Sequence, residues 1–191
     1  IGGSKGTQGS RKPRNYWFYS SDSLKLLEKT EMTNFSPETE KNKTLKAALE
    51  TGVNLLDSGL PDQAIKHFNA ALAINRKMPG THFLLAECLR QQDNPQQSIK
   101  HYKKALKLDP MLFEAQFNLG LILSSIGVFN GAKTSFRRAL KIKPGDPRSL
   151  EQLGLLLMKT GSYEDGLNYI LEASGKIVFS TEPNIPFKIE S

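Results

Sequence analysis

The sequence is short of the residues on which most covalent and metal chemistry depends. Its 191 residues include one cysteine, Cys88, so no internal disulfide can form and a reducing compartment is favoured. The three histidines have no Cys, Asp or Glu at metal-ligand spacing. The N-terminal glycines follow no strand and form no phosphate-binding loop. We therefore expect no catalytic residue, no metal site, no cofactor and no enzymatic activity.

Long apolar runs are absent as well. No stretch approaches the roughly 18 apolar residues of a membrane-spanning helix, so we expect no transmembrane segment. The chain begins at Ile1 rather than Met, which fits a processed product. The expected location is an intracellular, reducing compartment: the cytoplasm, or a plastid or mitochondrion if a transit peptide was removed.

What the sequence does contain is a pattern that repeats every 34 residues. Large side chains recur at this interval at Phe68, Tyr102, Phe136 and Ile170. Small residues recur in the same register at Gly52, Ala86, Gly120 and Gly154. A fixed period of this length is typical of stacked supersecondary units. We expect the small residues to let one helix approach its neighbour, and the large ones to fill the space between them.

Each repeat contains two segments with helical periodicity, separated by a turn. The turn signals also recur, at Gly59, Asp93-Asn94-Pro95, Gly127 and Gly161-Ser162. Asn94 and Asp146 are expected to cap helices that begin at the following prolines. Ser162 with Asp165 is similar to a capping box. The pattern predicts eight helices in antiparallel pairs between residues 45 and 176, with no β-sheet.

The segment Asp109-Pro110-Met111-Leu112-Phe113-Glu114-Ala115-Gln116-Phe117-Asn118-Leu119-Gly120 resembles the consensus of the tetratricopeptide repeat. That resemblance implies an all-α, right-handed α-solenoid of four helix-turn-helix repeats, at 45–78, 79–112, 113–146 and 147–180. It also implies a protein-binding scaffold with a concave groove lined by the first helix of each repeat. Arg76, where the family expects proline, and Gly166, where it expects alanine, depart from the consensus near the array ends.

The regions outside the repeats differ in composition. Residues 1–44 form a basic arm followed by an aromatic and leucine-rich docking segment, and residues 181–191 form an extended tail. The docking segment contains Tyr16, Trp17, Phe18, Tyr19, Leu24 and Leu27. Three roles remain open for it: docking in the array's own groove, docking on a partner, or stacking on nucleobases. The apolar residues between 177 and 189 are expected to lie against the last repeat or a partner.

The resemblance assigns the groove by repeat position. Its expected contact residues are Leu49, Val53, Phe83, Glu87, Arg90, Phe117, Leu121, Arg148, Leu155 and Met158. Chaperone-binding members of the family hold a peptide carboxylate with Lys and Asn, where this chain has Leu49 and Val53. The groove is therefore expected to be apolar and to suit a helix or an extended peptide, with Phe83, Phe117, Leu121 and Leu155 as its floor. The alternative is that these residues are partly buried between helices.

A second surface is the outer ridge formed by the second helices of the repeats. It concentrates positive charge at Lys100, Lys103, Lys104, Lys107, Lys133, Arg137, Arg138 and Lys141. We call these residues the basic ridge. It is either a solvated helix face or a contact for an acidic protein, RNA or an anionic membrane surface.

Together these features predict a non-enzymatic interaction scaffold, acting as an adaptor, assembly factor or structural subunit of a larger complex. The alternative is a basic accessory subunit of a ribonucleoprotein or nucleic-acid complex that uses the basic ridge. A regulatory repeat domain of a longer enzyme is a third interpretation. The identity of the partner does not follow from the fold, because such scaffolds host many unrelated functions.

Overall fold

The protein, represented by a computed structural model, is described for Leu27 and residues 40–175. Within residues 40–175 the chain is helical and contains no strand. The helices are α2 (Glu40–Asp57), α3 (Pro61–Ile74), α4 (Pro79–Gln91), α5 (Pro95–Leu108), α6 (Phe113–Ser125), α7 (Phe129–Ile142), α8 (Pro147–Lys159) and α9 (Tyr163–Ser174). The predicted eight helices and the absence of a sheet are therefore confirmed for this part of the chain.

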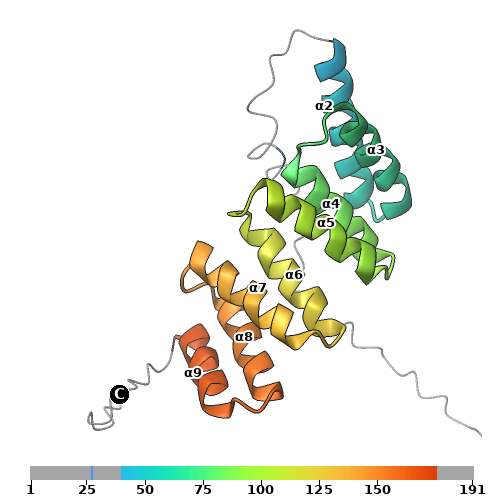
Figure 1. The fold of residues 1–191 in the computed structure, drawn as a ribbon. Helices are drawn as coiled ribbons and strands as arrows, with labels where there is room; N and C mark the ends of the chain where they lie inside the picture. The colour runs from blue at the N-terminus through green and yellow to red at the C-terminus, as the bar shows by residue number, and fades with distance from the viewer. Residues whose placement is uncertain (1–26, 28–39, 176–191) are drawn as a thin grey trace, which may run out of the picture.

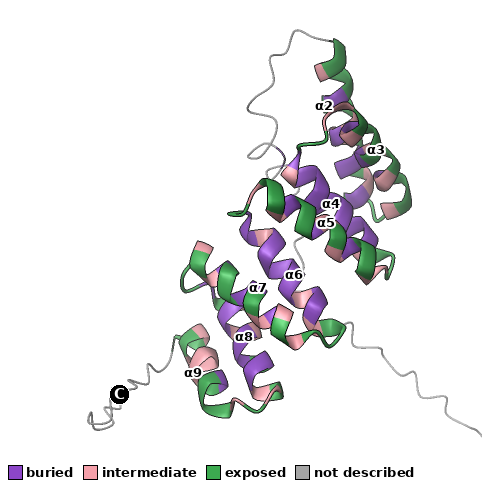
Figure 2. Cartoon of the chain, viewed as in Figure 1, coloured by how far each residue is buried: buried purple, intermediate pink, exposed green. Residues whose placement is uncertain are grey.

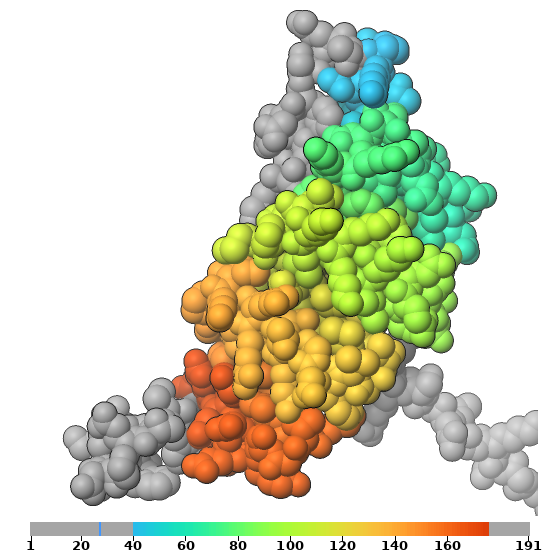
Figure 3. Space-filling model, in the orientation of Figure 1, coloured from blue at the N-terminus to red at the C-terminus, as the bar shows by residue number. Residues whose placement is uncertain are grey.

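The helices form a stack in which each one packs against its predecessor and its successor. Figure 1 shows the pairs following one another from α2 and α3 at one end to α8 and α9 at the other. In the space-filling view each pair forms a band next to the preceding band (Figure 3). This is an all-α solenoid, as the repeat predicts.

The turns within the pairs share one backbone conformation. Gly59, Gly127 and Gly161 have φ between 73° and 88°, in the left-handed region that glycine adopts without steric cost. In the second repeat Asp93 takes the same place with φ of 55°. Asp tolerates this region better than most residues do. The predicted stop signals therefore end α2, α4, α6 and α8 by a common mechanism.

The contact between the paired helices depends on the alternation of small and large residues. A Cβ atom added to Gly120 would lie 2.6 Å from the Phe136 ring, and one added to Gly52 would lie 2.7 Å from Phe68. Phe68, Tyr102 and Phe136 are completely buried. The rings thus pack directly on the backbone of the preceding helix, which explains why small residues recur at this repeat position.

Two of the three predicted N-terminal helix caps are confirmed. Asn94 Oδ1 accepts a hydrogen bond from the Gln97 backbone N–H at 3.3 Å, and Asp146 Oδ2 accepts one from the Ser149 backbone N–H at 3.0 Å. The capping box expected at Ser162 is wrong, because its side chain makes no capping hydrogen bond. The first helix begins at Glu40 rather than Leu45, because an exposed polar turn extends it.

The buried residues form one continuous core along the stack. Figure 2 shows buried positions running along α4 and α6, while α5 and α7 expose most of the surface that faces the viewer. All residues of α4 from Gly80 to Leu89 are buried. These buried residues include Phe83 and Glu87, two of the predicted groove contacts.

Candidate partner-binding surfaces

The aromatic residues expected on the groove floor lie in the core. Phe83 is 1% exposed and packs against Tyr102, with the ring centroids 5.9 Å apart. Phe117 is 2% exposed and packs against Phe136 at a similar distance. The prediction that Phe83 and Phe117 form an accessible floor is therefore wrong. Aromatic residues at these repeat positions pack against the second helix of their own repeat.

Exposure at one groove position changes systematically along the array. Val53, Glu87, Leu121 and Leu155 are equivalent residues in the four repeats. Val53 is 2% exposed and Glu87 5%, whereas Leu121 is half-buried and Leu155 is 48% exposed. Leu49, one turn before Val53, is also completely buried. The groove contacts predicted at Leu49, Val53 and Glu87 are therefore inaccessible, and the accessible part of the groove lies at α6 and α8.

Glu87 belongs to a buried polar network that joins three helices. Asn118 Nδ2 of α6 donates a hydrogen bond to Glu87 Oε1 at 2.8 Å, and the Tyr102 hydroxyl of α5 donates to the same oxygen. Arg90 pairs with Glu87 Oε2 through Nε and Nη2, both at 3.2 Å. Burial and the negative charge of Glu87 raise the pKa of Tyr102 well above its usual value, which keeps the phenol a donor.

Leu27 is the one described residue of the predicted docking segment. Its side chain is completely buried, and it belongs to the same core cluster as Leu45, Leu49 and Val53. The other predicted docking residues, Tyr16, Trp17, Phe18, Tyr19 and Leu24, lie outside the described residues. So does the tail from 176 to 191. Leu27 shows that chain preceding the first repeat contributes to the core of the array.

At the other end of the groove an arginine covers the aromatic core. The Arg148 guanidinium lies 5.0 Å from the Phe117 ring centre and 5.6 Å from that of Phe113. It also lies 3.6 Å from Asp146 Oδ1. Leu155 is exposed and Met158 is half-buried on the same helix, α8. This end therefore presents a fixed cation beside apolar side chains.

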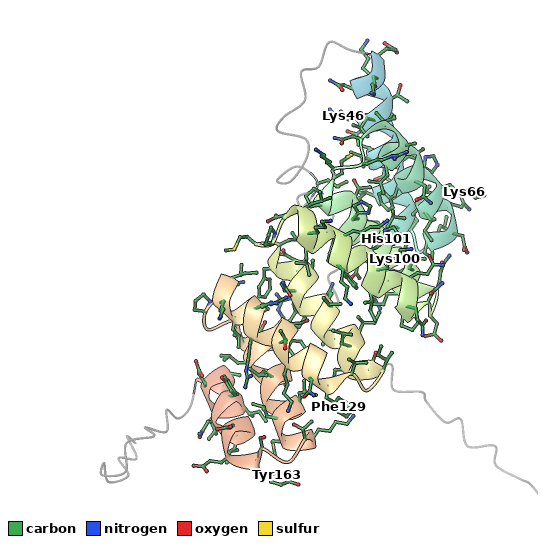
Figure 4. All side chains as sticks on the ribbon, viewed as in Figure 1. Lys46, Lys66, Lys100, His101, Phe129 and Tyr163 are labelled. Atoms are coloured by element: carbon green, nitrogen blue, oxygen red, sulfur yellow. The ribbon has the colours of Figure 1, made fainter. Side chains whose placement is uncertain are left out.

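The basic ridge is accessible, as its position on the second helices requires. Seven of its residues are exposed and Lys133 is half-buried. None of them forms an ion pair with another residue between 40 and 175. Figure 4 labels Lys66 on α3 and Lys100 on α5, and both side chains are exposed. The ridge cations are therefore free to contact an anionic partner.

Nucleophilic chemistry is not supported at Cys88. Burial and the neighbouring Glu87 raise the pKa of its thiol to about 12, so the thiolate that would react is disfavoured. No three His, Cys, Asp or Glu side chains gather at metal-binding distance within the described ranges. No helix of that part of the chain is long and apolar enough to cross a membrane.

Two families match the centre of the array. The one described as "TPR repeat" matches residues 86–127, and the one described as "Tetratricopeptide repeat" matches residues 113–146. The second match coincides with α6 and α7 and the turns that follow them. The central part of the chain, residues 86–146, therefore carries tetratricopeptide repeats. This assignment supports a protein-interaction scaffold in general and points to no particular partner.

Solved structures with the same fold include several of MamA. One, titled "Crystal structure of MamA", is 22% identical with a TM-score of 0.67, and the match covers 80% of this chain and 83% of that one. Another, of MamA residues 41 to the end from Desulfovibrio magneticus RS-1, is 21% identical with a TM-score of 0.66, covering 69% and 75%. At this identity the likeness shows the tetratricopeptide fold alone. No curated protein matches the sequence.

Sequence reasoning missed the Glu87 network within this fold. The signal was present, because an acid occupies a repeat position that holds Val53, Leu121 and Leu155 in the other repeats. A buried carboxylate needs hydrogen-bond donors, and Tyr102 and Asn118 supply them from the next two helices. The departure from the apolar pattern therefore marked a polar contact inside the core.

Proposed function

We propose that this protein is a non-enzymatic scaffold that holds a helix or an extended segment of a partner protein on the concave side of α6 and α8. In that role it acts as an adaptor, assembly factor or structural subunit of a complex. The observation that carries the proposal is the exposure of Leu155 at 48%, at a position that is buried in the first two repeats. Leu121, the equivalent residue of the third repeat, and Met158, three residues after Leu155 on α8, are half-buried.

The chemistry of this end suits a partner with an apolar face and a nearby anion. Leu121, Leu155 and Met158 offer apolar contact area, and methionine adapts to partners of different shape. Arg148 is held over the Phe117 ring, so its position is set before binding. Preorganised cations lose less side-chain entropy when they pair with a carboxylate. Apolar contact and a positioned cation together favour an amphipathic segment.

The test compares two leucines of similar exposure. Leu155→Glu changes the proposed site, whereas Leu167→Glu changes an exposed leucine of α9 at 46% exposure. Both tagged variants and the wild type are expressed in the source organism, and captured proteins are quantified after chemical cross-linking. We expect Leu155→Glu to lose a set of partners that Leu167→Glu retains. Identical partner sets for the two variants would show that this end of the groove is not the binding site.

A second candidate function, the basic accessory subunit of a ribonucleoprotein, draws on the basic ridge. Its support is the row of exposed cations on α5 and α7. None of these cations forms an ion pair with an acidic residue between 40 and 175. Phosphate contacts make log affinity fall linearly with log salt. Titration of a single-stranded RNA at several salt concentrations, with Lys104→Glu/Arg137→Glu as the variant, tests it. A shallow slope that the variant leaves unchanged would remove this alternative.

A further inference from the structure

A cleft of about 890 Å³ lies on the outer side of the array, between α5 and α7. Its floor is apolar and includes Leu106, Leu119, Leu123 and Ile142. Four residues of the basic ridge line it from its two sides, namely Lys103, Lys107, Arg138 and Lys141. No acidic side chain lines the cleft within the described part of the chain. The basic ridge is therefore hollowed at its centre, with apolar surface below the charges.

One polar atom of the cleft is buried without a partner. Gln116 of α6 lines the cleft and is 5% exposed, and its Oε1 accepts no hydrogen bond from the residues that the structure describes. A buried carbonyl oxygen without a donor is destabilising, because it has lost its hydrogen bonds to water and gained none in return. Such an oxygen in a cleft selects a ligand that brings an N–H or O–H group to it.

The neighbouring repeats carry larger side chains at the positions equivalent to Gln116 and Ser135. Gln116 and Ser135 occupy the positions of His82 and His101 one repeat earlier. The two imidazoles fill that place, with ring centres 5.4 Å apart and Nδ1 atoms separated by 3.3 Å. Figure 4 labels His101 on α5 beside Lys100.

The fourth repeat fills the same place with Leu150, which is 4% exposed, and the half-buried Tyr169. The third repeat has a small serine and an unpaired amide instead, and Thr134 replaces Lys100 beside them. Ser135 is smaller than its equivalents His101 and Tyr169, and the cleft lies next to it.

We propose that the cleft binds an extended acidic segment of a partner protein. A backbone N–H of the segment donates to Gln116 Oε1, its apolar side chains contact the floor, and its carboxylates pair with Lys103, Lys107, Arg138 and Lys141. The inference rests on the proposed function as a protein scaffold and adds a second, chemically distinct site on the opposite side of the array. An extended peptide carries all three groups at once, because side chains alternate in direction along its backbone.

Other anionic ligands satisfy fewer of these features. The phosphates of RNA offer only acceptors to an oxygen that needs a donor. Its ribose hydroxyls and base N–H groups can donate, but RNA has no aliphatic side chains to contact the leucine floor. An ionised fatty acid supplies a carboxylate and an apolar chain, but it has no N–H or O–H for Gln116. The segment of a protein is the occupant that matches the floor, the charges and the buried amide together.

The experiment uses a fluorescein-labelled peptide of sequence Glu-Leu-Glu-Phe-Glu-Leu-Glu and the full chain, with binding followed by anisotropy. The filled variant is Gln116→Leu/Ser135→Tyr, which installs the residue pair of the fourth repeat and leaves every charge in place. We expect it to bind at least about tenfold more weakly than the wild type, a difference of roughly 1.4 kcal/mol. A peptide with Gln in place of Glu should also bind more weakly.

A second variant tests the cleft even if Gln116→Leu/Ser135→Tyr fails to fold. Lys103→Glu/Arg138→Glu reverses two exposed charges without touching the core, and it should weaken the Glu peptide more than the Gln peptide. Leu167→Glu, an exposed position outside both proposed sites, should leave the peptide affinity unchanged. Loss of binding only in Leu155→Glu, in the concave groove, would overturn the cleft and leave the groove function intact. Failure of the Glu peptide to bind at millimolar concentration, or binding of cis-parinaric acid alone, would also overturn it.

Discussion

Equivalent residues are buried near the beginning of this array and exposed at its end. At the groove position, Val53 and Glu87 are buried in the first half of the array, whereas Leu155 is nearly half exposed at the end. Leu27, from outside the repeats, is also part of the core. A repeat consensus therefore fixes the direction of a side chain but leaves its accessibility to whatever packs on that face.

The largest effect is expected from a variant that tests whether residues before the first repeat stabilise the array. Leu27→Ala removes a completely buried side chain and should lower the free energy of unfolding by about 3 kcal/mol. Leu60→Ala, at 43% exposure, is the matched control and should change it by less than about 0.5 kcal/mol. Chemical denaturation measures both. Equal effects would mean that Leu27 adds nothing to the core and that the contrast between the two ends has another origin.

A smaller effect is expected at the groove position itself. Glu87→Gln keeps the size of the side chain but removes the charge that Arg90, Tyr102 and Asn118 contact, and should cost about 2 kcal/mol. Leu155→Gln, at the equivalent position of the fourth repeat, should be nearly neutral because that side chain is already exposed. Differential scanning calorimetry compares the two. Similar losses in Tm would show that burial at this position does not decide its contribution.

The smallest effect concerns pH and the second repeat. Burial, His82 and the cations Lys104 and Lys100 lower the pKa of His101 to about 4, and burial with Lys104 lowers that of His82. The unfolded chain therefore binds protons that the folded chain does not, and stability should fall as pH drops from about 6.5 towards 4. We expect a loss on the order of 1 kcal/mol, because His82 is buried but His101 is only half-buried and so partly screened by solvent.

The matched variant is His82→Gln/His101→Ser, which copies the Gln116 and Ser135 pair of the third repeat. Denaturation at pH 7 and at pH 4.5 should show a smaller pH dependence for this variant than for the wild type. The remaining loss in the variant belongs to the carboxylates that titrate in the same range. An unchanged pH dependence would assign the whole effect to those carboxylates.

Much of the fold follows from the sequence because its determinants are local or strictly periodic. Gly59 and Gly127 end helices through a backbone conformation that glycine favours, and any side chain at Gly120 would clash with the Phe136 ring. Such rules involve residues at fixed separations, so one sequence suffices to apply them. The helix pairs and their turns could therefore be placed without a structure.

The binding surfaces were less predictable because accessibility depends on several helices at once. Phe83 and Phe117 occupy groove positions in the consensus, yet Tyr102, Phe136 and Arg148 cover them from neighbouring helices. The cleft beside Gln116 could not be foreseen either, since it arises from missing bulk at Ser135 in the adjacent helix. For both the groove and the cleft, the difference between repeats becomes visible when equivalent residues are compared in the folded structure.

The carboxylate of Glu87 has a consequence for how cooperatively the array unfolds. In a linear stack, each repeat is coupled only to its neighbours, and the strength of each coupling sets how far an opening spreads. Glu87 ties the second repeat to Asn118 of the third through a buried hydrogen bond, so these two repeats open and close together. Between the third and fourth repeats, the polar contact is the partly exposed Arg148 above Phe113 and Phe117. We therefore expect hydrogen exchange to be slower in the two repeats that this hydrogen bond joins than in the last helix pair.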